Sequence, residues 1–178
     1  MKRCALFVIA IAVLLSGLCA VDDNNSVQMT MTFDASKLKR PEYKVGFTKS
    51  EITSEGFSNS TTATLVADYS TQTFKPYDLF LSYYLRDNAA VAIYLDLNSN
   101  LTSDDGSSLA YIVTFNDGHS VSSNGANKSL KIASVPAATS VGQFTMGSLP
   151  FTIYVDSFAS LPSTTLTSTM TVRVQSEV

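Results

Sequence analysis

Residues 90–97, with the sequence AVAIYLDL, show most clearly which fold class this chain adopts. Val91, Ile93, Leu95 and Leu97 stand at every second position, so in an extended chain they all fall on one face. Branched and aromatic side chains are also common in strands, because they pack well on a pleated surface. The stretch therefore predicts a β-strand with one buried face.

The same spacing of apolar residues recurs on both sides of this stretch and is separated by Gly, Pro, Asn and Ser. Asn116-Asp117-Gly118, for example, has the chemistry of a tight hairpin turn. No segment after the N-terminal region has a convincing helical period. We expect an all-β fold, an immunoglobulin-like antiparallel β-sandwich of about 8–10 strands, with a barrel as the second choice. The other expected strands lie within residues 27–33, 43–47, 63–69, 79–83, 109–115, 130–132, 151–155 and 166–174.

The first twenty residues have the three parts of a secretory signal peptide. Lys2 and Arg3 precede an unbroken apolar run at residues 5–15, and residues 16–20 are mostly small. A run of this length is too short to cross a bilayer, which needs about 20 apolar residues. We expect cleavage after Ala20, no transmembrane segment in the mature chain, and a location outside the cytoplasm: secreted, periplasmic or on the cell surface.

Both cysteines, Cys4 and Cys19, lie in the predicted signal peptide. Cleavage after Ala20 would leave a mature chain that forms no disulfide, although its compartment would permit one. The alternative is cleavage before Cys19 and lipidation of that residue, as in bacterial lipoproteins. Leu18 departs from that pattern, which usually has a small residue immediately before the cysteine.

The charge of the mature chain argues against a nucleic-acid partner. Removing Lys2 and Arg3 leaves 10 basic against 15 acidic residues, a net charge of −5. Nucleic acids and anionic lipids both require a basic surface. The remaining 158 residues suffice for one domain with a substantial core.

No catalytic, cofactor-binding or metal-binding residues are predicted. His119 is the only histidine, and no Gly-x-Ser-x-Gly motif supplies a nucleophile for it, so we interpret it as an exposed turn residue. Asp96, Asn98 and Asn100 have the spacing that begins a calcium loop, but Leu101 and Ser107 stand where its glycine and glutamate belong. The sequence therefore predicts a protein that is not an enzyme, with a secreted hydrolase as the least favoured alternative.

The two ends of the mature chain carry the most specific signal. An alternating strand begins soon after the cleavage site and is followed by a polar linker at residues 34–40. The chain then ends within its last alternating segment, after a Ser- and Thr-rich approach that follows Leu161-Pro162. This layout resembles the subunits of chaperone–usher fimbriae and the related spore-coat-protein-U-like secreted domains. Many members of that family carry a disulfide, which this mature chain lacks, and their common C-terminal tyrosine motif is not evident.

The resemblance implies assembly by donor-strand exchange, in which the extension of one subunit completes the sheet of the next. The implied donor residues are Val27, Met29, Met31 and Phe33, and the implied residues of the acceptor groove are Leu166, Met170, Val172 and Val174. It also implies a homo- or hetero-oligomer, a periplasmic chaperone and usher, and a structural or adhesive role at the cell surface.

Two descriptions of the N-terminal region remain open at this point. Residues 21–40 form either a donor extension or the first strand and linker of a complete sandwich, ahead of a domain at residues 41–178. The first description predicts a polymerising structural subunit. The second predicts a self-complete secreted domain that binds a glycan or protein ligand, and pairing of residues 27–33 within their own sheet would favour it.

Overall fold

A computed structural model describes residues 28–34, 43–68, 70–75, 79–140, 142–156 and 165–177. This part of the chain is all-β and contains no helix, as the sequence predicts. Its strands are β1 (Gln28–Asp34), β2 (Lys44–Thr48), β3 (Thr62–Asp68), β4 (Thr73–Lys75), β5 (Phe80–Leu85), β6 (Val91–Leu97), β7 (Leu101–Thr102), β8 (Ser108–Leu109), β9 (Tyr111–Phe115), β10 (Ser120–Ser122), β11 (Ser129–Val135), β12 (Thr145–Val155) and β13 (Thr165–Ser176).

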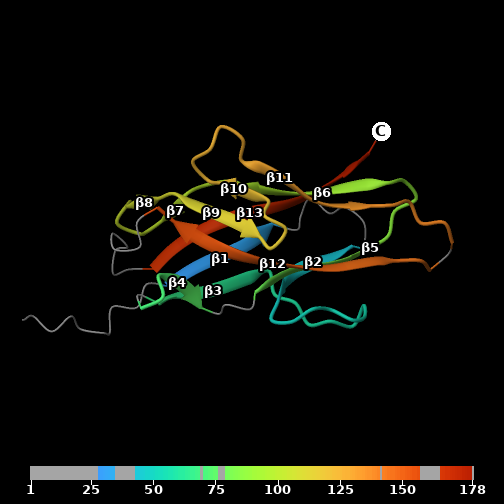
Figure 1. Cartoon of the computed structure of the whole chain (residues 1–178), viewed down its shortest axis with the longest axis horizontal. Helices are drawn as coiled ribbons and strands as arrows, with labels where there is room; N and C mark the ends of the chain where they lie inside the picture. The colour runs from blue at the N-terminus through green and yellow to red at the C-terminus, as the bar shows by residue number, and fades with distance from the viewer. Residues whose placement is uncertain are drawn as a thin grey trace, which may run out of the picture.

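The strands form two sheets that face each other as a β-sandwich (Figure 1). The first sheet has the order β11-β6-β13-β1-β3-β4, and a short β7–β8 pair extends from β13. The second sheet has the order β10-β9-β12-β5-β2. Apart from the parallel pair β1–β13, all the pairings in both sheets are antiparallel.

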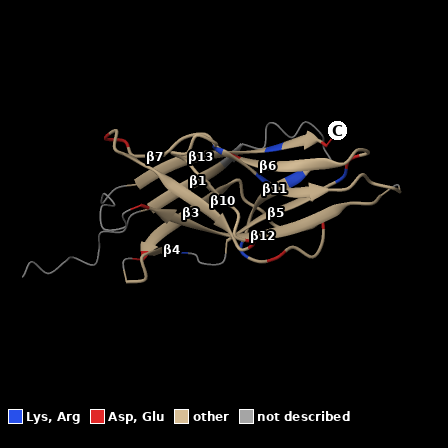
Figure 2. Cartoon of the chain, turned by 45° about the horizontal axis from the view of Figure 1, so that its top comes forward, with Lys and Arg blue, Asp and Glu red and all other residues tan. Residues whose placement is uncertain are grey.

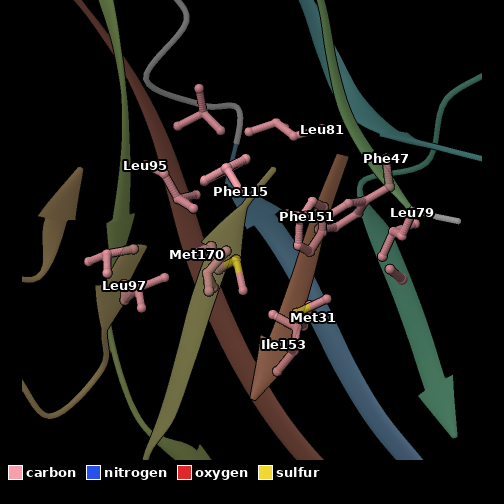
Figure 3. Packing of buried hydrophobic residues seen from close by; sticks show 14 of the residues in the cluster. Met31, Phe47, Leu79, Leu81, Leu95, Leu97, Phe115, Phe151, Ile153 and Met170 are labelled. Atoms are coloured by element: carbon pink, nitrogen blue, oxygen red, sulfur yellow. The ribbon is translucent and has the colours of Figure 1, made fainter. Parts of the chain in front are cut away.

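The core lies between the two sheets and is built from the alternating residues of each strand. The four apolar residues of β6 that the sequence places on one face are all buried, at no more than 1% exposure. Figure 3 shows Met31 and Met170 of the first sheet packed near Phe151 and Ile153 of the second. Because the described residues include no cysteine, the stability of this part comes from burial and strand pairing.

The described residues contain thirteen strands, more than the eight to ten expected. The additional ones are short: β4 and β10 have three residues, and β7 and β8 have two. Strands this short do not span enough positions for an alternating pattern to appear. Pairing with a neighbour, rather than local sequence, therefore defines them.

Strand β12 is also longer than its sequence pattern suggests, since it begins at Thr145 rather than Phe151. Its first half pairs with β5 and its second half with β9. Pro150 is the last residue that pairs with β5, and it directly precedes this change of partner. Proline cannot donate a backbone hydrogen bond, so a proline usually indicates a break or an edge in a strand.

Candidate functional site

The strand implied to be a donor lies inside the sheet of its own chain. β1 is flanked by β13, to which it runs parallel, and by β3, to which it runs antiparallel (Figure 1). Met29 pairs with Leu166 on one side and with Leu65 on the other. The structure therefore favours a first strand that belongs to a complete sandwich.

The implied donor and acceptor residues meet within this one chain. Met29 and Met31 have no exposed surface, and Leu166, Met170 and Val172 are buried at 1% exposure or less. Val174 is partly buried against the same core. The backbone of Phe33 pairs with Met170. Val27 lies outside the described residues.

The edge of the second sheet at β2 is closed by the loop that follows it. Phe47 and Ser60 exchange two backbone hydrogen bonds, with N···O distances of 2.8 and 3.0 Å. Asn59 Nδ2 donates to the carbonyl oxygen of Val45 at 3.0 Å. These bonds occupy backbone groups that an edge strand would otherwise offer to another chain.

The other outer strands are poor templates for a further strand. β4 and β10 have only three residues each. β11 has a register shift between Lys131 and Ala133, and Lys131 itself stands on this edge. Short strands, bulges and lysines are the usual protections of sheet edges. No described outer strand is therefore long, regular and uncapped.

The outer surface of the first sheet carries a regular array of threonines, which we call the threonine face. One row crosses four adjacent strands in register, and a second row crosses three strands. The side chains of β3, β7 and β13 in these rows are exposed, and those of the central β1 are half-buried. The first row is Thr102, Thr167, Thr30 and Thr64, and the second is Thr169, Thr32 and Thr62.

Beside this array, a polar cluster links β6, β13 and β11 on the same outer surface. Arg173 Nε donates to Asp96 Oδ2 at 3.0 Å, and Ser129 Oγ donates to the same carboxylate. The Arg173 guanidinium also lies 4.5 Å from the ring centroid of Tyr94. The hydrogen bond with Asp96 raises the pKa of Arg173. Each of these groups is engaged by a neighbour, so the cluster ties three strands together.

A second polar contact crosses the core between the sheets. Tyr111 Oη lies 2.9 Å from Ser168 Oγ, and both residues are buried. Burial raises the pKa of the Tyr111 phenol, because it disfavours the charged form. Ser168 Oγ also lies 3.1 Å from the carbonyl oxygen of Ser99, to which it donates. The hydroxyls are therefore satisfied inside the fold.

A cavity of about 600 Å³ opens between β2, the loop at residues 49–60 and β3. Apolar side chains line part of it, including Phe47, Ile52, Phe57 and Leu79. Its size falls in the range of small-molecule sites. Lys49 and Glu51 are its charged lining residues.

The structure places His119 at an exposed turn. Its Nδ1 atom lies 3.0 Å from Asp117 Oδ2, and its side chain is 69% exposed. The backbone N–H of His119, which donates to the same carboxylate, is the main cause of the lowered pKa of Asp117. This local pair shapes the turn after β9.

The side chains of the partial calcium pattern point to different partners. Asp96 binds Arg173, whereas Asn98 donates to Thr171 Oγ1 at 2.6 Å. Asn100 accepts a hydrogen bond from Ser123 Oγ at 2.7 Å. Among the described residues, no three His, Cys, Asp or Glu side chains are grouped so that they could hold a metal ion.

The threonine face is the feature that sequence reasoning missed. Its signal is present as the alternation of Thr with apolar residues in TMT, TAT and TLTSTMT, at residues 30–32, 62–64 and 165–171. Alternation shows that these threonines share the outward face of a strand. It does not show which strands are neighbours, so the rows become visible only in the folded sheet.

No family model matches this chain, and no curated protein is significantly similar to it. Within the part of the chain that the structure describes, no helix is long and apolar enough to cross a membrane.

Proposed function

We propose that this protein is an exported, non-enzymatic domain that folds as a self-complete, immunoglobulin-like β-sandwich and binds a glycan or protein ligand at its surface. The observation that carries the proposal is the pairing of β1 with both β13 and β3 of its own chain. The first strand thereby fills the place that a neighbour's strand would take in a donor-strand polymer.

The edges of the sheets support the self-complete form. The caps on β2, the three-residue strands β4 and β10, and the bulge and lysine of β11 all discourage strand addition. The immunoglobulin-like description is based on two facing sheets in which adjacent strands are often far apart in the sequence. Examples are the adjacent strands β6, β13 and β1.

Surface side chains support a binding role. Tyr154 on the second sheet is 48% exposed, and Tyr94 on the first sheet is partly exposed. Tyrosine is common in binding surfaces, because its ring offers a large apolar area and its hydroxyl a hydrogen bond. The export signal at residues 1–20 would bring such surfaces to ligands outside the cytoplasm.

The experiment compares residues 21–178 with a chain that starts at Lys44 and therefore lacks β1. We expect the longer chain to be a monomer by sedimentation and to unfold cooperatively at a midpoint that does not depend on concentration. The shorter chain should not fold alone, because it loses the strand between β13 and β3. Denaturant-resistant ladders of the longer chain, or a cooperatively folded shorter chain, would overturn the proposal.

A second candidate is a structural or adhesive surface subunit that exchanges β1 between copies. It is favoured by the position of β1 at the N-terminal end of the described chain, connected to β2 only through residues 35–43. The β1 of another copy would make the same contacts with β13 and β3, as in domain swapping. A periplasmic chaperone and usher would then be its partners.

The two candidates are separated by mixing two tagged preparations of residues 21–178 under native conditions. Co-purification of both tags in a complex that survives denaturant would establish strand exchange. Separate elution of the two tags, with each preparation monomeric, would leave the self-complete domain.

A further inference from the structure

We propose that the threonine face binds ice. This inference rests on one part of the proposed function, an exported domain whose β1 lies in its own sheet. It adds a second ligand, beyond the glycan or protein proposed above, at a separate surface. That ligand is a crystalline solid whose surface repeats in two dimensions, as the threonine face does.

The geometry of the sheet sets the repeat of the threonine face. Direct register places Thr102, Thr167, Thr30 and Thr64 side by side on four neighbouring strands. Neighbouring strands lie about 4.8 Å apart, and alternate residues of one strand lie about 6.7 Å apart. The seven threonines therefore form a nearly rectangular lattice that is limited to a few strands, because sheets twist.

The side chains of this lattice are chemically uniform and stiff. Every threonine presents one hydroxyl, which donates and accepts hydrogen bonds, and one methyl group. Branching at Cβ restricts the first side-chain torsion, so the pattern of hydroxyls and methyls changes little with time. Beneath the lattice, Met29, Met31 and Leu166 are fully buried and hold its strands against the core.

The exposed threonines of β7, β13 and β3 can contact water. Thr102 Oγ1 donates to the carbonyl oxygen of Thr167 at 3.5 Å, and Thr167 Oγ1 donates to that of Thr102 at 3.3 Å, so these two hydroxyls keep their lone pairs as acceptors for water. The side chains of Thr64 and Thr169 are exposed. Water molecules that are hydrogen-bonded to such regularly spaced groups adopt the spacing of the lattice. An ordered water layer of this kind is what a protein surface needs in order to bind ice.

The threonine face also has no charge. The stretches at residues 28–32, 62–66 and 165–169 contain no Lys, Arg, Asp or Glu and are drawn tan in Figure 2. Charged groups would bind their own hydration shells, and these would interrupt an ordered water layer. The charged residues of the first sheet, such as Arg173 and Asp96, lie beyond the rows.

Other ligand classes fit this surface less well. Small molecules bind in concave sites, whereas five of the seven threonines stand outside the cavity beside β3, which only Thr62 and Thr64 of these rows line. Protein interfaces are usually centred on aromatic or arginine side chains, and none stands in these rows. Sugars commonly stack on aromatic rings, which the rows also lack. Ice needs none of these features.

The test measures the uptake of fluorescently labelled residues 21–178 into a growing ice hemisphere, together with thermal hysteresis. We expect the native chain to enter the ice and Thr167→Tyr to reduce its uptake at least tenfold, because the bulky ring stands in the middle of the first row. The matched control is Gln175→Tyr, on the same strand and outer face but beyond the rows, and it should enter the ice like the native chain.

A second variant, Thr64→Tyr on β3, guards against misfolding of the first, and circular dichroism checks the folding of all chains. Exclusion of the native chain from ice would overturn the inference, as would equal uptake of both threonine variants and the native chain. Crystalline cellulose and chitin serve as rival solids, and binding to them alone, lost in Thr167→Tyr, would also overturn it. A monomeric, cooperatively unfolding chain that ice excludes would leave the proposed function standing.

Discussion

Met29 lies directly beside Leu166 in the parallel pairing of the first and last described strands, and neither side chain has any exposed surface. The two residues come from opposite ends of the chain and share one core with Met31 and Met170. The closing strand of the sandwich is thus supplied by the N-terminal end. Changes in β1 should act on the stability of the whole domain.

Replacing Met31 tests this dependence. Met31→Ala removes a fully buried side chain between the sheets, and we expect it to lower the free energy of unfolding by about 2–5 kcal/mol. The measurement is urea unfolding followed by circular dichroism. Thr32→Ala, at the next and outward-facing position, is the matched control and should change stability by less than about 0.5 kcal/mol. Equal effects of the two changes would contradict the burial of β1.

The cap on the β2 edge should depend on Gly46. A Cβ atom at this position would lie 2.9 Å from the backbone oxygen of Ser60 and would collide with the side chain of Asn59. We expect Gly46→Ala to displace the cap, lower the unfolding midpoint and promote self-association through the opened edge. Thermal unfolding and light scattering measure the two effects.

Gly56→Ala is the control for this change, because it adds the same methyl group in the following loop with only an ordinary contact, 3.7 Å from Ser54. It should leave both the midpoint and the monomeric state unchanged. A stable, monomeric Gly46→Ala chain would contradict the prediction, because it would show that the contacts of Asn59 and Ser60 with β2 are not needed for stability or for the monomeric state.

The buried phenol of Tyr111 should make stability sensitive to alkaline pH. Burial raises the pKa of Tyr111 above 10.0, so the folded state holds this proton more tightly than the unfolded state. Its contribution is complete below pH 10 and decreases as the pH rises through the folded pKa. We expect unfolding free energy to fall less steeply above pH 10 in Tyr111→Phe than in the native chain.

The same variant should cost about 0.5–1.5 kcal/mol at neutral pH, since it removes one buried hydrogen bond to Ser168. Urea unfolding at pH 7 and at several values above pH 10 gives both quantities. Tyr154→Phe is the control, because Tyr154 is 48% exposed. An identical alkaline slope in native and Tyr111→Phe chains would contradict the prediction.

The turn between β7 and β8 should be sensitive to acid. Hydrogen bonds from Ser103 and Ser107 lower the pKa of Asp105 to about 2. The ionised carboxylate therefore favours the folded turn at pH values above 3.8, and this effect disappears as the pH falls through 2. Nuclear magnetic resonance should show Asp105 titrating near pH 2 in the native chain. A Ser103→Ala chain should titrate at higher pH, and an unchanged value would contradict the hydrogen bond.

Much of the strand content could be predicted because alternation is a local property. Val91, Ile93, Leu95 and Leu97 are buried as their spacing indicates. Leu130 and Ile132 lie in β11, where a strand was expected, but their pairing with β6 could not be predicted. A register shift between Lys131 and Ala133 pairs Ala133, rather than Ile132, with Ile93 of β6. A bulge adds one residue to one strand, and only the partner strand reveals it.

The candidate surfaces were harder to predict, because they depend on which strands are neighbours. The polar cluster of Arg173, Asp96 and Ser129 joins three strands that are far apart in sequence. The cap of Asn59 on Val45 depends on the path of a loop. Neither the polar cluster nor the cap produces a periodic pattern in the sequence.

The sequence by itself determined that the described part of the chain is all-β and which side chains of its longer strands point inward, because the side-chain period of two is fixed within each strand. Only the tertiary structure decided that β1 lies between β13 and β3 and runs parallel to the last strand. Nearly every residue offers the same backbone donor and acceptor, so backbone hydrogen bonding does not select a particular partner strand. The choice of partner depends on how all the strands bury their apolar faces together. That choice placed Met29 beside Leu166 and aligned the threonines into rows.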